Sequence, residues 1–414
     1  MPNRTFTSPK RSLAHLRHVS PTTGRPTVLL VHNRYQLAGG EGAVFDAESA
    51  LLERHGYRVI RYERHNDEVD GLSRLELAKK TVWNRESYDQ LLALMRAEQP
   101  AIVHVHNTLP LISPAVYDAA REAGVPVVQT LHNYRLLCPN ALFLREGSPC
   151  EKCLGKAFAW PGVVHGCYRD SRPTTAAVAG MVAAHRARGT WTKKVDRYIA
   201  LTEFARAKLI QGGLPADKIT VKPHFVDPDP GPGTGKGGYA LYAGRLSEEK
   251  GIETLIEAWR RHQPALPLKV IGDGPLLPLV ESAREAGVEA VGRQPLDEVI
   301  RLMQGAVVVV IPSICYETFG RTAIEAYAAG TPVIVSDGGA VAELVRPGET
   351  GFLFPTGNAD ALAGTLTSFL AARDRWPVFR HNARAEFEAK YTGPRNAELL
   401  RELYASLERR SESV

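Results

Sequence analysis

Short apolar runs alternate with longer amphipathic stretches along most of the chain. Runs of four to eight apolar residues bounded by turn residues predict buried strands, and apolar spacing of three to four residues predicts helices. The first half contains such strands at Thr27–Asn33, Tyr57–Tyr62, Ala101–His106, Val125–Leu131, Asp196–Leu201 and Ile219–Val221, with helical segments at 44–56 and 118–124. Strands that alternate with helices favour a parallel sheet covered on both faces.

The same alternation restarts in the second half. Strands are predicted at Gly238–Ala243, Leu268–Ile271, Ala306–Ile311 and Pro332–Ser336, and helices at Gly251–Arg261 and Pro278–Ala286. Between the halves, the stretch DPDPGPGTGKGG has no large hydrophobic residue, and its Pro and Gly content predicts a flexible linker over 227–237. We therefore expect an α/β protein of two doubly wound, Rossmann-like domains, 27–226 and 238–380, facing a central cleft where ligands bind.

The two ends of the chain differ from this pattern. Residues 1–26 carry five Arg and Lys side chains, no acid and no apolar core, which predicts a disordered basic leader and not a signal peptide. Residues 381–414 end in an amphipathic segment, Pro394–Arg410, that predicts a final helix long enough to cross back to the first domain.

Composition and charge narrow the class of protein. With 414 residues, 44% hydrophobic and 23% charged, the chain has the composition of a soluble globular protein with room for two cores. The net charge of +6 suggests an anionic ligand or surface. No run reaches the roughly 20 apolar residues that span a bilayer, so we expect a cytoplasmic protein. Peripheral contact with the inner face of a membrane stays open, for example through the basic segment 173–194, although a helix packed on the first domain explains that segment as well.

The stretch Pro312–Gly330 carries the first candidate chemistry. It leads from a predicted strand through a loop into a helix, with Glu317 in the loop, Glu325 two turns into the helix and Gly320 between them. A helix N-terminus favours anions, and carboxylates accept hydrogen bonds from hydroxyls. A ligand with phosphates at one end and sugar hydroxyls at the other fits both features. The alternative is a surface helix with two solvated glutamates.

Two further glycine-containing turns follow strands. In GRLSEEKG, over Gly244–Gly251, Arg245 and Lys250 predict a compact anion site, although a basic surface turn would look the same. The turn Gly272–Pro275, GDGP, is interpreted as structural. In the first half, Gly39-Gly40 stands at the first strand-to-helix turn without the complete dinucleotide fingerprint.

Taken in series, these motifs resemble a known family. GRLSEEKG, GDGP, ETFGRTAIEAYAAG, TPVIVSDGGAVAELV and GETGFLF occur in the order and spacing of the retaining glycosyltransferases of the GT-B fold, family 4 type. In the first half, VHNRYQLAGGEGAVFDAE and TLHNYRLLCPN are similar as well, so the resemblance covers roughly residues 27 to 410.

The resemblance implies roles for four residues of the second domain. Arg245 and Lys250 match the positions that hold the diphosphate of a nucleotide-sugar donor. Glu325 matches the carboxylate that binds the ribose hydroxyls. Glu317 matches the one that contacts the transferred sugar.

It also implies roles for backbone and first-domain positions. The amides around Phe319 and Gly320 would meet the sugar or the β-phosphate. Gly39 and Gly40 match a glycine loop that closes over the donor, and His132 matches an active-site histidine that contacts the sugar and the reacting centre. By itself, His132 would be interpreted as a satisfied histidine in a turn.

The expected function follows from these roles. The protein would transfer a hexose-type sugar, with retention of configuration, from a nucleotide diphosphate donor to an acceptor hydroxyl on a glycan, glycolipid or small metabolite. Positive groups would stabilise the leaving diphosphate, so no metal cofactor is required for catalysis. One alternative is a nucleotide-sugar epimerase or hydrolase of the same fold. Another is a zinc-containing nucleic-acid-binding protein, which the scattered basic residues disfavour, so no nucleic-acid partner is expected.

Four of the five cysteines form a separate cluster in sequence, within an insert at about 138–167. Clustered cysteines in a cytosolic protein favour a metal over disulfides, and Cys138, Cys150, Cys153 and Cys167 are interpreted as ligands of a structural zinc, with His165 as a substitute ligand. Free thiols or a disulfide remain alternatives. Because the insert follows His132, we expect it to shape the acceptor pocket. Cys315 is expected to be a packed thiol, and the D-x-D of 227–229 is interpreted as linker, not as a metal site.

Overall fold

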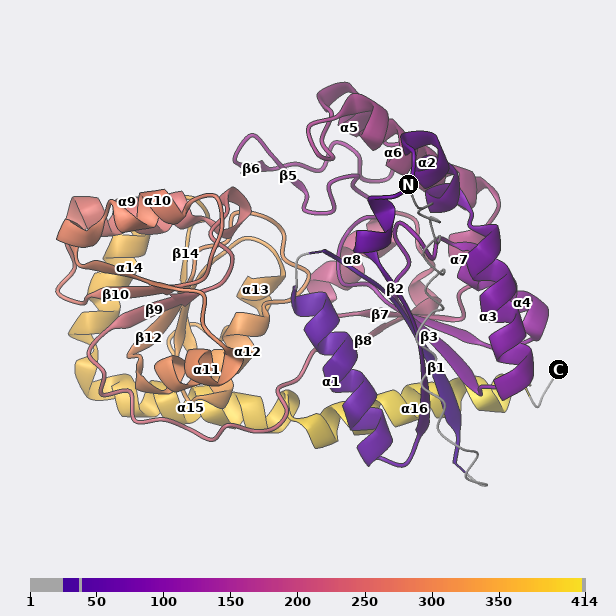
Figure 1. Ribbon diagram of the computed structural model, residues 1–414. Coiled ribbons are helices and arrows are strands. Elements are labelled where there is room, and N and C mark those ends of the chain that lie inside the picture. The colour runs from indigo at the N-terminus through magenta and orange to yellow at the C-terminus, as the bar shows by residue number, and fades with distance from the viewer. Residues whose placement is uncertain (1–24, 37–38, 412–414) are drawn as a thin grey trace, which may run out of the picture. The chain divides into compact units, whose positions relative to one another are not determined.

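The computed structural model describes residues 25–36 and 39–411, and Figure 1 draws its ribbon. The chain forms two compact units, which divide between Val127 and Val128. Residues 1–24 of the predicted leader lie outside the described part.

The first unit is built on parallel strands. Its elements are β1 (Thr27–Arg34), α1 (Gly40–Arg54), β2 (Arg58–His65), α2 (Arg74–Val82), α3 (Arg85–Glu98), β3 (Ile102–Asn107) and α4 (Ala115–Ala123). Strand β1 pairs in parallel with both β2 and β3. Its apolar residues 28–31 are fully buried, as expected for a central strand whose two faces are both covered.

The second unit begins with three more parallel strands and the insert. Its first elements are β4 (Val127–Thr130), β5 (Leu144–Arg145), β6 (Ser148–Pro149), α5 (Trp160–His165), α6 (Arg172–Ala187), α7 (Thr190–Lys193), β7 (Arg197–Ala200), α8 (Glu203–Gln211) and β8 (Ile219–Val221). Strand β7 pairs in parallel with β4 and β8, whereas β5 and β6 form a short antiparallel hairpin. The strand order of this sheet is β2-β1-β3-β4-β7-β8.

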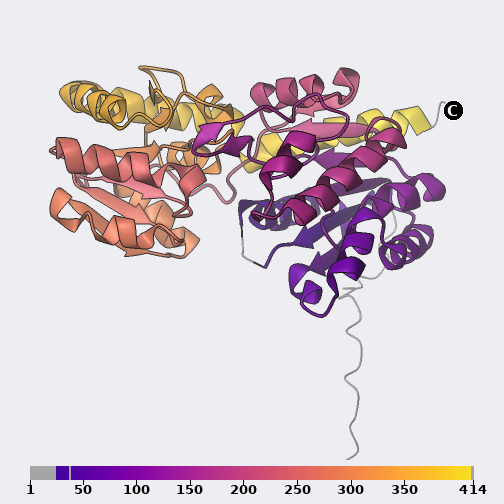
Figure 2. The same cartoon turned by 90° about the horizontal axis from the view of Figure 1, so that it is seen from above.

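A second six-stranded parallel sheet follows, in the order β11-β10-β9-β12-β13-β14. Helices lie on both of its faces, α9 with α10 and α14 on one and α11 with α12 and α15 on the other (Figures 1 and 2). The elements are β9 (Ala240–Ala243), α9 (Ile252–His262), β10 (Leu268–Ile271), α10 (Leu277–Glu281), β11 (Val288–Gly292), α11 (Leu296–Gly305), β12 (Val308–Ile311), α12 (Arg321–Ala328), β13 (Val333–Ser336), α13 (Ala340–Glu343), β14 (Gly351–Phe354), α14 (Ala359–Ala371), α15 (Trp376–Lys390) and α16 (Gly393–Ser411).

The predicted fold class, two parallel-sheet Rossmann-like α/β domains, is confirmed. Two differences from the expected elements have local causes. Strand β11 was not expected because it lies at the sheet edge, where Glu289 and Ala290 are exposed and no apolar run is needed. The helix expected over 278–286 ends at Glu281 and gives way to a separate 3-10 turn over Arg284–Ala286.

The glycine-rich segment between the sheets is bound along the second sheet's helices. The amides of Gly233, Gly235 and Gly237 donate to the carbonyls of residues 329, 304 and 305, at the ends of α12 and α11. Asp229 forms a bidentate ion pair with Arg384 of α15, at 2.6 and 2.7 Å. The segment is thus fixed by hydrogen bonds, in contrast to the flexible linker that was expected. Its Asp229 pairs with an arginine.

The alanine-rich, basic segment folds as α6 and α7. Trp191 is 3% exposed, and its indole donates to the carbonyl of Val182. This aromatic ring is therefore part of the core, as expected for a packed helix. Among the described residues, no helix combines the length and the apolar character that crossing a membrane requires.

Candidate active site

The loop between β12 and α12 enters its helix through a glycine that the packing requires. Gly320 has a φ of 145°, and a Cβ at this position would lie 2.8 Å from Cγ2 of Val341. Only glycine fits such a conformation and such a contact. Helix α12 begins directly after this loop, and the amides at the start of a helix are groups that can bind an anion.

Glu317 of this loop is the acceptor of two hydrogen bonds. Its Oε1 accepts from Nζ of Lys250 at 2.6 Å and from Oγ of Ser313 at 2.8 Å. Burial by itself would raise the pKa of Glu317, but the charge of Lys250 and the two hydrogen bonds outweigh it, so the pKa is lowered. Burial lowers the pKa of Lys250, but neighbouring groups, above all the negative charge of Glu317, together raise it by more, so the pKa is higher than its ordinary value. Both groups are thus charged at neutral pH, and Oε2 of Glu317 has no hydrogen-bond partner among the described residues.

The loop that carries Arg245 and Lys250 is in close contact with the backbone of two neighbouring loops. Gly251 has a φ of 69°, and a Cβ there would lie 1.9 Å from the carbonyl oxygen of Pro312. On the other side, the amide of Leu246 donates to the carbonyl of Asp273, in the GDGP turn. Arg245 is exposed and forms no ion pair among the described residues, so its guanidinium faces solvent while Lys250 is paired.

Glu325 lies on α12 beside an arginine. Its Oε1 accepts a hydrogen bond from Nη2 of Arg321 at 2.8 Å, and its side chain is 12% exposed. This carboxylate is held one turn into the helix, in a position to accept hydrogen bonds from hydroxyls of a ligand. The structure places Glu317 and Glu325 on either side of Gly320, as the sequence indicates, but α12 begins only at Arg321, so Glu325 lies one turn into the helix and not two.

His132 lies beside the same loop. Its carbonyl accepts from Oγ1 of Thr318 at 2.7 Å, and its ring stacks on His224, with 5.3 Å between centroids and 18° between planes. The ring of His224 in turn meets the edge of Phe319 at 5.1 Å. Within the second unit, His132, Phe319, Glu317 and Lys250 are therefore brought together.

Three residues of this group were not singled out from the sequence. Ser313 donates to the carboxylate of Glu317, and Tyr134 donates to the carbonyl of Glu317 at 3.1 Å. The ring of His224 lies between His132, on which it stacks, and Phe319, which it meets at a steep angle. Tyr134 stands within the quoted stretch TLHNYRLLCPN, which offered a signal. His224 follows the short strand β8 in no recognised motif, so only the fold could reveal it.

Gly39 and Gly40 belong to the first unit, at the start of α1. Gly39 is the N-cap residue, with φ −137°, and Gly40 is the first helical residue. The carbonyl of Gly39 accepts from the amide of Ala43 at 3.3 Å. Their expected role in closing over a donor stays a prediction.

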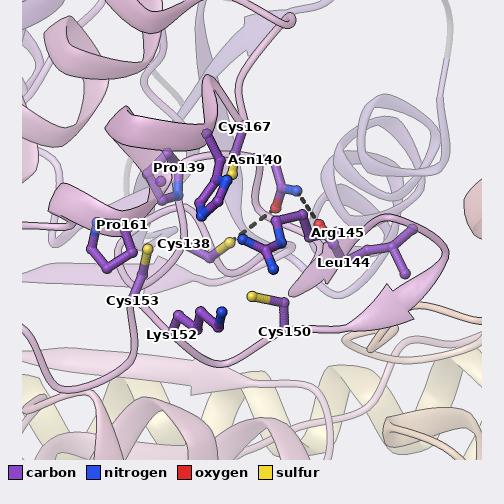
Figure 3. Close-up of a pocket in the computed structure, with 12 residues that line it drawn as sticks. Cys138, Pro139, Asn140, Leu144, Arg145, Cys150, Lys152, Cys153, Pro161 and Cys167 are labelled. Atoms are coloured by element: carbon purple, nitrogen blue, oxygen red, sulfur yellow. Dashed lines mark hydrogen bonds between the residues drawn. The ribbon is translucent and has the colours of Figure 1, made fainter.

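The four cysteines of the insert line one small pocket (Figure 3). Cys138, Cys150, Cys153 and Cys167 come together with Arg145, Lys152 and His165, among other lining residues. All four are free thiols. Burial, followed by the proximity of the other thiols, raises the pKa of Cys153 to about 11. The pKa of Cys167 is raised in the same way by burial and by Cys150.

A second group of ligand-type side chains is buried in the first unit. Oε1 of Glu48 lies 3.1 Å from Nδ1 of His104 and 3.2 Å from Nε2 of His106, and their side chains are at most 1% exposed. Among the described residues, these three are the group whose ligand atoms all lie within 4.8 Å of one another. The rings of His104 and His106 pack at 4.6 Å. We interpret the group as a histidine–carboxylate network that packs α1 onto β3.

Two family models match consecutive parts of the chain. Residues 38–230 match the model described as Glycosyltransferase Family 4, and residues 231–386 match the model described as Glycosyl transferases group 1. Together the two matches run from residue 38 to residue 386.

Similar proteins agree with these matches. Glycogen synthases of Mycobacterium tuberculosis are 35% identical over 160 residues, which cover 36% of this chain and 38% of the relative, so the chain matches less than half of their length. Sucrose-phosphate synthase of Thermosynechococcus elongatus has a similar structure, with a TM-score of 0.69, 19% identity and coverage of 92% of this chain and 99% of the other. HepE of Anabaena, solved with UDP-glucose, gives a TM-score of 0.64 at 19% identity, covering 92% and 99%.

Proposed function

We propose that the chain, which matches two glycosyltransferase family models in succession and has the GT-B fold, transfers a hexose-type sugar from a nucleotide diphosphate donor to an acceptor hydroxyl, with retention of configuration. The observation that carries this proposal is the group formed by Lys250, Glu317 and Ser313 at the start of α12. It combines a cation for a phosphate with a carboxylate whose second oxygen can accept from a sugar hydroxyl.

The charges of the site fit the expected chemistry. As the bond between the anomeric carbon and the diphosphate oxygen breaks, negative charge develops on the leaving group. Lys250 and the first amides of α12 are held in place by the fold, and the exposed Arg245 would turn to the diphosphate, so that together they stabilise this charge. The acceptor oxygen forms the new bond to the anomeric carbon, and its proton passes to the leaving diphosphate. Retention means that the acceptor attacks from the face that the diphosphate leaves.

The remaining residues would orient the donor. Glu325 would accept from the ribose hydroxyls, while the amides near Phe319 and Gly320 meet the sugar or the β-phosphate. His132 would contact the sugar from the other side of the same loop, where its carbonyl is bonded to Thr318. Gly39 and Gly40 would cover the donor from the first unit.

Relatives suggest the class of donor and acceptor. HepE was solved with UDP-glucose, and relatives are described as glycogen synthases and as a lipopolysaccharide 1,2-N-acetylglucosaminetransferase. We propose by analogy a UDP-hexose or related nucleotide sugar as donor and a saccharide, glycolipid or small metabolite hydroxyl as acceptor, in the assembly of a surface polysaccharide, glycolipid or glycosylated metabolite.

The test is a donor screen followed by product analysis. Full-length protein is incubated with UDP-, GDP- and ADP-sugars, first in a thermal-shift assay and then with sugar and glycolipid acceptors. We expect one donor class to raise Tm and a new glycoside to form only when acceptor is present. The anomeric coupling constant of the product, measured by NMR, must match that of the donor.

Three outcomes would contradict the proposal. Conversion of the donor at the same rate without an acceptor would indicate an epimerase or hydrolase. An inverted product would remove retention. Absence of any donor-dependent shift, in protein that unfolds cooperatively, would remove the nucleotide-sugar site.

A further inference from the structure

We propose that the insert binds one zinc ion through the sulfurs of Cys138, Cys150, Cys153 and Cys167. This site lies outside the group of residues assigned to the sugar donor, and the proposal does not depend on which sugar is transferred.

The four cysteines reach the pocket from separate segments that the backbone holds. The amide of Cys138 donates to the carbonyl of Tyr134 at 2.9 Å, and that of Cys150 to Phe143 at 2.7 Å. The amide of Cys167 donates to the carbonyl of Gly162 at 3.0 Å. Figure 3 shows the four side chains around one pocket. Since about 30 residues of loop and short helix separate the first from the last, their convergence is a property of the fold.

The cations that line the pocket match the charge of such a site. Zinc with four thiolates carries a net charge of −2. Arg145 and Lys152 line the same pocket. Nη1 of Arg145 is buried and has no hydrogen-bond partner among the described residues, and a buried donor without a partner is costly. The same guanidinium pairs with Glu146 through Nη2, at 3.7 Å from Oε2. A zinc-bound thiolate would accept from Nη1, so the metal site would account for the nitrogen that is left without a partner in the described part of the chain.

The choice of metal follows from the ligands. Thiolates are soft ligands that select zinc among the common divalent metals, and four cysteines suit a closed, structural, tetrahedral site. Among the described residues, the cysteine sulfurs do not form a group of three ligand atoms as close together as those of Glu48, His104 and His106. Binding would therefore draw the loop together and release a proton from each thiol to solvent.

The loop between two of these ligands contacts the candidate donor site. Glu151, between Cys150 and Cys153, accepts from Nζ of Lys208 at 2.6 Å. Nζ of Lys208 in turn lies 5.5 Å from the centre of the ring of Tyr316, which precedes Glu317. A zinc site here would fix a loop that is linked through Lys208 to the residue next to Glu317.

The first experiment measures metal content. Full-length protein purified under reducing conditions without chelator should contain about one zinc per chain, by plasma mass spectrometry. Serine substitution of each of the four cysteines should remove most of it. Cys315→Ser is the matched control, because Cys315 is a buried thiol outside the pocket, and it should keep the metal. His165→Ala should keep it as well.

The second experiment reads the ligands without any variant, so it remains decisive if a serine variant fails to fold. Native protein is treated with an alkylating reagent before and after chelator, and the modified cysteines are identified by mass spectrometry. We expect the four thiols to be protected from alkylation before chelator is added and to be modified afterwards. Exchange of the zinc for cobalt should produce thiolate-to-cobalt charge-transfer absorption.

Several results would overturn the site. Reduced protein that neither contains zinc nor takes up zinc or cobalt would exclude it. The cysteines would be a disulfide site and not a zinc site if protein purified without reductant contains two disulfides among them and takes up no metal after reduction. Loss of zinc in His165→Ala, together with retention in one of the serine variants, would show that the ligand set is wrong.

Discussion

The ammonium group of Lys250 lies 2.6 Å from Oε1 of Glu317, although the two residues stand 67 positions apart. They come from different loops that follow neighbouring strands, β9 and β12. The contact requires Gly251, because only glycine lets the carbonyl of Pro312 approach this closely. The cation that we assign to the donor phosphate and the carboxylate that we assign to the sugar are thereby held in one group.

Replacing Lys250 by methionine should reduce transfer by about 100-fold or more, because a fixed cation for the leaving diphosphate is lost. Steady-state rates with the donor found in the screen measure the effect. Lys269→Met is the matched control. Lys269 lies on strand β10 and also pairs with a glutamate, Glu289, at 3.2 Å. Equal rates in the two variants would remove Lys250 from the donor site.

Replacing Glu317 by glutamine should lower the free energy of unfolding by about 1.5–3 kcal/mol at pH 7, because hydrogen bonds to a charged group are lost. Urea titrations measure it. Glu289 is itself exposed and pairs with the half-buried Lys269, so Glu289→Gln should cost less than about 1 kcal/mol.

The difference in free energy of unfolding between the parent protein and Glu317→Gln should depend on pH. The pKa of Glu317 is lowered from its ordinary value of 4.5, so its contribution is present above pH 4.5 and is lost as the pH falls through the folded-state pKa. The difference between parent and Glu317→Gln should shrink at acid pH. A constant difference down to pH 3 would contradict the role of the ionised carboxylate.

Gly251→Ala should destabilise the protein more than Gly287→Ala. Both glycines have a positive φ, 69° and 80°, so each substitution costs about 1 kcal/mol of backbone strain. Only at Gly251 would the new Cβ meet a carbonyl, at 1.9 Å, whereas nothing lies within 4 Å at Gly287. Urea titration of the pair isolates the steric term. If the two variants unfold alike, the close approach to Pro312 is wrong.

Glu325→Ala should raise KM for the donor by about 10- to 100-fold with a smaller effect on kcat, because a charged hydrogen-bond acceptor for the ribose is lost. Kinetics over a range of donor concentrations separate the two constants. The exposed Glu285, replaced in the same way, should leave both unchanged. An unchanged KM in Glu325→Ala would remove it from the ribose site.

The sequence predicted the sheets and the donor-side motifs because both depend on local pattern. An apolar run bounded by turn residues, such as the one in β12, indicates a buried strand, and the order Glu317, Gly320, Glu325 places one carboxylate in the loop and one in the helix. The pairing of Lys250 with Glu317 was not predicted, since it depends on how closely two loops approach. The edge strand β11 and the stacked His224 lacked any local signal for the same reason: their places are set by neighbours distant in sequence.

The bound course of the glycine-rich segment changes what its composition would suggest about cleavage. A stretch of Gly and Pro is ordinarily an easy substrate for a protease, which must pull several residues into an extended form in its own active site. Here the amides of Gly233, Gly235 and Gly237 donate hydrogen bonds to backbone carbonyls, and Arg384 forms an ion pair with Asp229. A protease would have to detach the segment from α11 and α12 first, so the folded chain opposes cleavage of the peptide bonds that look most vulnerable in the sequence by holding their backbone in place.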